Sequence, residues 1–147
     1  MPYWLLKTEP EEYSYCDLER DGSTIWDGVS NPLALKHLRT MEIGDLVLIY
    51  HTGKERRVIG VAEVVTQPYP DPKLDDGKRV VIQVRAVRRV PQPVTLTQIK
   101  QDGNFEGFDL LRLQRLSVVP VSESHWERLL ELTGVSIHLL MLSLARL

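Results

Sequence analysis

The histidines and the single cysteine are the first side chains to test for catalysis or metal binding. The four histidines, His37, His51, His125 and His138, show no spacing typical of a metal-binding pair. Cys16 has neither a basic neighbour nor a glycine-rich turn around it, so we interpret it as a structural thiol. P-loop, GxGxxG and GxSxG motifs are absent from the sequence. The sequence therefore predicts no catalytic residue, no metal site and no cofactor.

Two aromatic segments combine flat rings with hydrogen-bonding groups. Trp26 is followed by Asp27 and then by Asn31, in a polar turn that leads into a predicted helix. Tyr50-His51-Thr52 stands at the end of a predicted strand. An aromatic face beside donors and acceptors is what recognition of a planar, polar base requires, and stacking contributes about 1–3 kcal/mol per base. The alternative for Trp26 is packing in the core, which composition alone favours.

The charge of the 147-residue chain is nearly balanced, with a net charge of −2 and a pI near 6.1. This balance argues against a protein that binds nucleic acid through bulk electrostatics. The distribution is uneven, because residues 1–35 carry two basic and seven acidic groups, whereas residues 68–90 carry six and three. The side chains predicted to contact a nucleic-acid backbone are Lys54, Arg56, Arg57, Arg79 and Arg85. The alternative is that they are solvated loop and strand side chains.

Apolar periodicity predicts a small domain built mainly from short strands. β-rich runs occur at 3–7, 24–26, 45–50, 58–65, 79–87 and 116–121. Gly60 stands inside the fourth run, which predicts a β-bulge or a close backbone approach. Most connections are too short for the crossover that parallel strands need, so a mostly antiparallel barrel is favoured over a doubly wound sheet.

Helix signals fall between these strands. Asn31 and Pro32 are an N-cap and a first helical residue, and Gly44 is predicted to end that helix. Ser124 and Glu127 have the spacing of a capping box. Further short helices are predicted at 95–101, after 124 and at 135–147. Strands and helices together predict an α+β fold.

Targeting and membrane signals are weak. The first seven residues lack the basic front end of a signal peptide, and the longest apolar-rich stretch, 135–147, has at most 13 residues. A membrane-spanning helix needs about 20 residues. The sequence therefore predicts a cytoplasmic protein with no membrane partner, and a lone cysteine fits a reducing compartment.

Several segments, taken together and in order, resemble the EVE domain family of the PUA-like superfamily. They are YWLLKTEP (3–10), WDGV (26–29), Asn31, Gly44-Asp45, YHT (50–52), YPD (69–71), PVTL with IK (93–100), RLSV with PV (115–121) and Trp126. Each segment is weak evidence alone, whereas their common order is specific.

The resemblance implies a fold and a function. The implied fold is a PUA-like, mixed but mostly antiparallel pseudo-barrel of about six strands surrounded by short helices. The EVE domain would span residues 1–132, and residues 133–147 would be a C-terminal helical extension packed on the same domain. The implied function is a non-catalytic reader module that binds a modified base, either cytosine or adenine, in DNA or RNA.

The resemblance also assigns side chains to a base-binding pocket. By kinship with YTH domains, Lys7 and Thr8 would line the pocket and Trp26 would form one wall. Side chains in EVE motif positions around the same cavity are Glu9, Asp27, Asn31, Tyr50, His51 and Thr52. Ser30 stands where the family usually has Arg or Lys, which removes one expected phosphate contact.

Two alternatives stay open. Lys7, Thr8 and Glu9 supply the residue types of the ASCH-type amidohydrolases that act on modified cytidine, which would make the protein a small enzyme. Adjacent strand residues alternate faces, however, so Lys7 and Glu9 would share a pocket while Thr8 points away. The other alternative is a protein-interaction module, in which the C-terminal helix packs on a second copy to form a homodimer instead of on its own barrel as a monomer.

Overall fold

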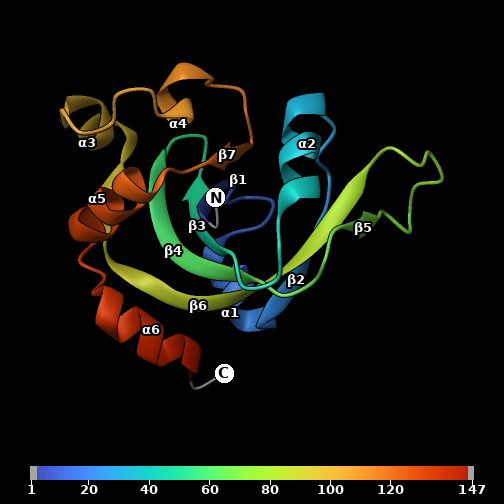
Figure 1. The fold of residues 1–147 in the computed structure, drawn as a ribbon, viewed down its shortest axis with the longest axis horizontal. Helices are drawn as coiled ribbons and strands as arrows, with labels where there is room; N and C mark the ends of the chain where they lie inside the picture. The colour runs from blue at the N-terminus through green and yellow to red at the C-terminus, as the bar shows by residue number, and fades with distance from the viewer. Residues whose placement is uncertain (1–2, 146–147) are drawn as a thin grey trace.

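A strongly curled β-sheet forms the centre of the computed structural model, which describes residues 3–145 (Figure 1). Its strands are β1 (Tyr3–Thr8), β2 (Ser23–Trp26), β3 (Leu46–His51), β4 (Arg57–Val64), β5 (Tyr69–Pro70), β6 (Val80–Thr95) and β7 (Val118–Pro120). The helices around it are α1 (Tyr15–Asp21), α2 (Pro32–Thr40), α3 (Leu96–Gln101), α4 (Asp109–Arg112), α5 (Glu123–Thr133) and α6 (Ile137–Ala145).

The sheet is mixed but mostly antiparallel. Its strand order is β2-β6-β4-β3-β1-β7, and the short β5 pairs with β6 off this path. Among the described strands only β1 and β3 pair in parallel, and Lys7 lies opposite Tyr50 in their register. The predicted fold class is thereby confirmed: a half-barrel dominated by antiparallel strands, with short helices around it.

Bulges allow the long strands to curl. The pairing of β4 with β6 shifts register between Val58 and Gly60 and again between Val61 and Ala62. Gly60 faces the ring of Tyr15, and a Cβ atom at Gly60 would lie 2.3 Å from that ring. The bulge predicted at Gly60 is confirmed, and the group that approaches it closely is the side-chain ring of Tyr15.

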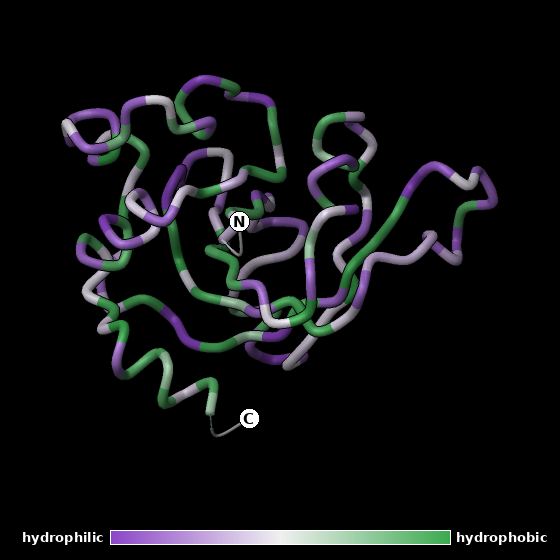
Figure 2. The backbone as a smooth tube through the Cα atoms, in the orientation of Figure 1, coloured by the Kyte–Doolittle hydropathy of each residue, from purple (hydrophilic) through white to green (hydrophobic). Residues whose placement is uncertain are grey.

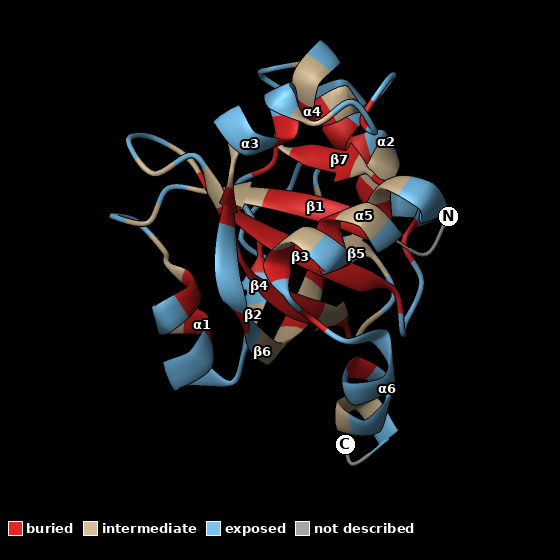
Figure 3. Ribbon diagram, turned by 90° about the vertical axis from the view of Figure 1, so that its left-hand side faces the viewer, coloured by how far each residue is buried: buried red, intermediate tan, exposed pale blue. Residues whose placement is uncertain are grey.

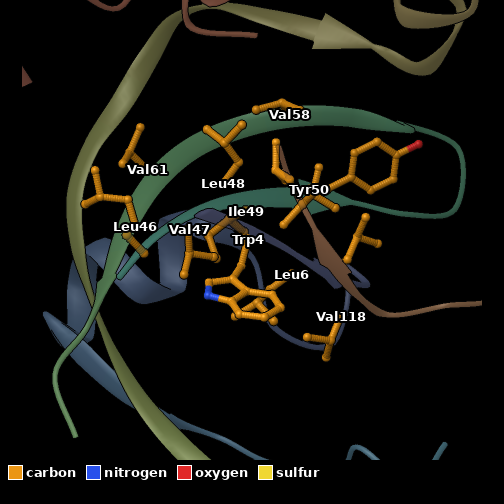
Figure 4. Close-up of a cluster of buried hydrophobic side chains, with 14 of the residues drawn as sticks. Trp4, Leu6, Leu46, Val47, Leu48, Ile49, Tyr50, Val58, Val61 and Val118 are labelled. Atoms are coloured by element: carbon orange, nitrogen blue, oxygen red, sulfur yellow. The ribbon is translucent and has the colours of Figure 1, made fainter. Parts of the chain in front are cut away.

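The core lies inside the curl of the sheet (Figure 3). All six residues of β3 are buried, and the strand lies between β1 and β4 in the middle of the sheet. Trp4, Leu6, Val47 and Val118 gather in one apolar cluster from three strands (Figure 4). At the rim of this cluster, the indole N–H of Trp4 donates to Asp45 over 2.9 Å.

Two predicted helix boundaries are wrong. The helix that begins after Asn31 ends at Thr40, so Gly44 lies in the following turn, where its N–H donates to the carbonyl of Val64. α5 begins two residues earlier than the Ser124 capping box requires, because Ser122 is the N-cap and its hydroxyl accepts from the His125 N–H.

The middle strand is also longer than predicted. β6 continues through Pro91 and Pro93 to Thr95, whereas sequence alternation predicts its end at Val87. Pro91 and Pro93 are exposed and lie between Arg89 and Val94, where β6 has no partner in its register with β4, so their missing N–H groups cost no ladder bond there. The short helix α4 has no counterpart in the predicted elements.

The C-terminal helix packs through part of its surface. α6 buries Leu140, whereas Ile137, Leu139, Met141 and Leu142 are exposed, and apolar residues run along most of its length (Figure 2). Within residues 3–145 no single helix is long and apolar enough to cross a bilayer, and α5 with α6 reaches that composition only as a pair bent by 97°.

The contact between Gly60 and Tyr15 predicts a large effect of one methyl group. We expect Gly60→Ala to lower the free energy of unfolding by about 3 kcal/mol, because the new Cβ overlaps a ring that is itself fully buried. Gly103→Ala is the control, since a Cβ there meets nothing within 4 Å. Urea unfolding followed by circular dichroism measures both variants, and equal stabilities would contradict the proposed contact.

Candidate functional site

A cavity of about 960 Å³ opens where β1 and β2 end. Five separate parts of the chain meet there: the end of β1 with the loop after it, the end of β2 with the turn after it, the residue after β3, the loop before β6, and the segment before β7. The lining residues are Lys7, Thr8, Glu9, Glu12, Tyr13, Thr24, Ile25, Trp26, Asp27, Gly28, Val29, Thr52, Lys73, Gln114, Arg115 and Ser117.

Parallel pairing brings the first of these parts together. β1 and β3 run in the same direction, so their carboxyl ends meet at one edge of the sheet. The N–H of Thr52 donates to the carbonyl of Thr8 over 2.9 Å and closes that edge. Lys7, Thr8 and Thr52 therefore line one cavity although they come from distant positions in the sequence.

Lys7, Thr8 and Glu9 all reach the cavity, which the simple alternation of strand residues does not predict. The strand ends at Thr8 and the chain turns, with the N–H groups of Glu12 and Tyr13 donating to the carbonyl of Glu9. Beyond a strand end the side chains no longer point alternately to two faces. All three residues therefore line the cavity, including Thr8, which simple alternation would place on the opposite face.

Aromatic side chains form one wall of the cavity. Trp26 is only 8% exposed, so it packs on the core and also lines the cavity. The ring of Tyr13 stands edge-on to it, with ring centroids 6.5 Å apart and planes at 88°. Sequence reasoning missed Tyr13. The available signal was its position directly before the Ser14–Asp17 capping box, which starts α1.

The ammonium group of Lys7 is the partly buried cation of the cavity. Its Nζ donates to the carbonyl of Gln114 over 2.9 Å. Desolvation by burial lowers the pKa of Lys7 below its ordinary value. A charged lysine carries three N–H donors, so two remain for a ligand.

Thr8, Glu9 and Asp27 supply the polar edge of the cavity. The Thr8 hydroxyl donates to the carbonyl of Tyr13 over 2.6 Å, which leaves its oxygen as an acceptor. Glu9 and Asp27 are exposed carboxylates. Lys73 approaches Asp27 from the loop before β6, with 3.8 Å between its Nζ and the carboxylate.

His51 lies outside this cavity and holds the neighbouring loop. The side chain is 5% exposed, and its Nε2 accepts from the backbone N–H of Tyr15 over 3.0 Å. The other ring nitrogen, Nδ1, lies 3.0 Å from Glu55, and this hydrogen bond lowers the pKa of the Glu55 carboxyl. Both ring nitrogens are thus engaged within the protein, with the proton on Nδ1.

Asn31 and Tyr50 also lie elsewhere. Asn31 caps α2, since its side-chain oxygen accepts from the N–H of Ala34 over 3.0 Å. Tyr50 lines a second cavity of about 220 Å³, which shares Lys7, Thr52 and Gln114 with the large one. The other residues that line this second cavity are Gly53, Arg56, Leu96, Lys100 and Leu110.

Of the five cations predicted to contact a backbone, only Arg56 lines either cavity. Three others pair with acids close to them: Arg57 with Glu55 at 3.1 Å, Arg79 with Asp76 at 3.5 Å, and Arg85 with Glu63 at 3.1 Å. Lys54 is exposed on the loop between β3 and β4.

The cations around the cavities come from other segments. Lys73 and Arg115 line the large cavity and Lys100 lines the small one. Lys100 and Arg115 belong to a stretch with no basic excess, so charge counting along the sequence does not reveal them. Among residues 3–145, no group of three or more His, Cys, Asp or Glu side chains is placed to hold a metal ion.

Curated relatives share most of the chain. Thymocyte nuclear protein 1 of Rattus norvegicus is 29% identical over an alignment that covers 88% of this chain and 73% of the relative. The Homo sapiens protein is 28% identical with the same coverage.

Solved structures have the same fold. A protein from Agrobacterium tumefaciens matches with a TM-score of 0.89 and 34% identity, covering 92% of this chain and 94% of that one. Human THYN1 protein, solved in complex with 5-methylcytosine-containing DNA, matches with a TM-score of 0.82 and 27% identity, covering 89% and 96%.

A more distant structure shares the fold alone. The ASCH protein of Zymomonas mobilis matches with a TM-score of 0.57 and 12% identity, covering 89% of this chain. The family model for the EVE domain matches residues 2–132. This chain therefore belongs to the EVE domain family.

Proposed function

We propose that this protein binds DNA by taking a methylated cytosine into the large cavity, without catalysing a reaction on it. The observation that carries the proposal is the aromatic wall of Trp26 and Tyr13 in a cavity of about 960 Å³ with polar edges. A relative of the same fold, human THYN1 protein, is known in complex with 5-methylcytosine-containing DNA. The size of the cavity lies within the ~300–1,000 Å³ of typical small-molecule sites.

Each part of the cavity has a role in this proposal. The base stacks on Trp26, which contributes about 1–3 kcal/mol. The two free donors of Lys7, the hydroxyl of Thr52 and the carboxylate of Glu9 or Asp27 read the polar edge of the base.

The methyl group by itself supplies limited discrimination. Burying one methyl carbon against an aromatic ring contributes about 0.8 kcal/mol, or about fourfold in affinity. A preference well above fourfold requires that the unmethylated base also leave a polar group unsatisfied in the cavity.

The charge around the cavity favours selective over non-specific binding. Glu9, Glu12 and Asp27 balance the three cations that line the large cavity, Lys7, Lys73 and Arg115. Because the lining of the large cavity is neutral overall, its electrostatic attraction to the phosphate backbone of any sequence is weak. Most of the binding free energy must then come from the base. The nearly neutral chain is thus compatible with DNA binding through a pocket.

Hydrogen bonding disfavours the amidohydrolase alternative. A hydroxyl nucleophile needs a general base in contact with it. Within residues 3–145, the Thr8 hydroxyl bonds to the carbonyl of Tyr13, whereas Lys7 bonds to the carbonyl of Gln114. Lys7 and Thr8 therefore each contact backbone, and neither activates the other.

The stacking role of Trp26 is tested by titrating oligonucleotides with 5-methylcytosine or cytosine at one position. We expect wild-type protein to prefer the methylated strand by at least about fourfold, and Trp26→Ala to lose about tenfold in affinity for it. Trp26→Phe retains a ring and should lose less.

Trp126→Phe is the matched control for the loss of an indole. Trp126 is buried and stacks on Tyr3 at 4.7 Å, and it does not line the cavity. Its variant should bind methylated DNA as wild type does once the folded fraction is equal. Equal affinity of wild-type protein for both strands would refute methylcytosine recognition. Tighter binding of a modified RNA than of methylated DNA would refute DNA as the ligand.

Arg115 should contact phosphate, and the salt dependence of binding tests this. We expect Arg115→Ala to reduce the slope of log K against log salt by about 0.9 on duplex DNA. Arg112→Ala removes a nearby arginine that is paired with Asp109 and does not line the cavity, so its slope should stay unchanged. An unchanged slope in both variants would exclude the contact.

Lys7 should link the site to stability at alkaline pH. Its pKa is lowered in the folded protein, so between that pKa and the ordinary lysine value the unfolded chain binds more protons. The free energy of unfolding then rises with pH in this window. In Lys7→Met the rise contributed by Lys7 disappears and methylated DNA binds more weakly. Urea unfolding between neutral pH and pH ~10.5 measures the difference, and parallel curves for both proteins would contradict it.

A further inference from the structure

The small cavity beside the base site is unusually rich in cations for its size. Lys7, Arg56 and Lys100 line it, and no acidic residue does. Within residues 3–145 none of these three side chains forms an ion pair with a carboxylate at 4.0 Å or less. Three unpaired cations around one cavity repel each other, and a bound anion would relieve that repulsion.

Tyr50 adds a hydrogen-bond donor to these charges. Its side chain is only 3% exposed, and within residues 3–145 its hydroxyl has no hydrogen-bond partner, although it lines the cavity. The hydroxyl points away from the apolar cluster that packs on its ring (Figure 4). Burial raises the pKa of Tyr50, so the phenol keeps its proton and donates.

The volume of the cavity limits what it can hold. At about 220 Å³ it is smaller than the ~300–1,000 Å³ of typical ligand pockets. A compact anion fits the combination of small volume, three cations and one neutral donor better than a second base does. Phosphate is such an anion, since lysine, arginine and hydroxyl donors all bind its oxygens.

The two cavities are joined through shared residues. Lys7, Thr52 and Gln114 line both, so the small cavity adjoins the site proposed for the base. The carbonyl of Arg56 accepts from the N–H of Leu96 over 2.8 Å. This bond ties the loop that carries Arg56 to the start of α3, which carries Lys100.

We propose that the small cavity, through Lys100, Arg56 and the hydroxyl of Tyr50, binds the backbone phosphate next to the base held in the large cavity. The proposal rests on the proposed function, since that phosphate belongs to the nucleotide taken into the base site. In this proposal the Tyr50 hydroxyl donates a hydrogen bond to the phosphate and does not contact the base.

The experiment removes one phosphate charge at a time. Oligonucleotides that contain one 5-methylcytosine carry a neutral methylphosphonate either directly 5′ or directly 3′ of it, or three phosphates away. We expect one of the two adjacent positions to weaken binding to wild-type protein about tenfold and the distant position to have little effect. Lys100→Ala and Tyr50→Phe should each bind the strand with an unmodified backbone more weakly than wild type does. The affinity of these variants should no longer change when the methylphosphonate is placed at that same position.

Lys36→Ala is the control for the loss of an exposed lysine. Lys36 lies on α2 and lines neither cavity, so this variant should keep the wild-type affinity and the wild-type response to methylphosphonate. Thermal unfolding of each variant shows whether its fold is retained, and Tyr50→Phe keeps the buried ring in place.

Additive effects of Lys100→Ala and methylphosphonate at both adjacent positions would overturn the proposal. Inorganic phosphate is a further arm: if it binds as tightly as the oligonucleotide does, the cavity serves a free anion and the backbone assignment fails. A cytosine strand run in parallel tests the proposed function separately. Equal binding of methylated and unmethylated strands, with the coupling to Lys100 intact, would refute methylcytosine recognition and leave the phosphate site standing.

Discussion

The parallel pairing of β1 with β3 is the constraint on which the candidate site depends. It is the only parallel pair among the described strands, and it places both carboxyl ends at one edge of a sheet that is otherwise antiparallel. The hydrogen bond from Thr52 to Thr8 closes that edge. An antiparallel arrangement of the same two strands would separate Lys7 from Thr52 by the length of the strand.

Tyr15 holds the loop that completes the cavity. Its N–H donates to His51, its hydroxyl donates to the carbonyl of Val61, and its ring lies over Gly60. The residues just before it, up to Tyr13, are thereby fixed against the end of β1. His51 therefore contributes to the site by positioning this loop, through a ring that never reaches the cavity. A residue of a family motif, such as His51, can thus support a binding site without contacting the ligand.

Much of the fold follows from local patterns in the sequence. Asn31 with Pro32 starts a helix, Thr95 caps the next one, and Pro120 stands on an edge strand, because capping and proline sterics act within a few residues. The two wrong helix boundaries arise because neighbouring residues offer the same local signal. Gly44 lies in a turn and does not end the helix, and Ser122 is the N-cap in place of Ser124. The division of the chain at residue 132 stays a prediction.

The sequence by itself determined most of the strands, the N-cap at Asn31, the EVE motifs and the candidacy of Trp26. Only the tertiary structure decided that Tyr13 completes the aromatic wall, that His51 and Asn31 serve the scaffold, and which cations face the cavities. Lys100 and Arg115 illustrate the reason. Hydrophobic period and capping act between near neighbours in the chain, whereas a cavity is made by residues from distant segments that strand pairing brings together.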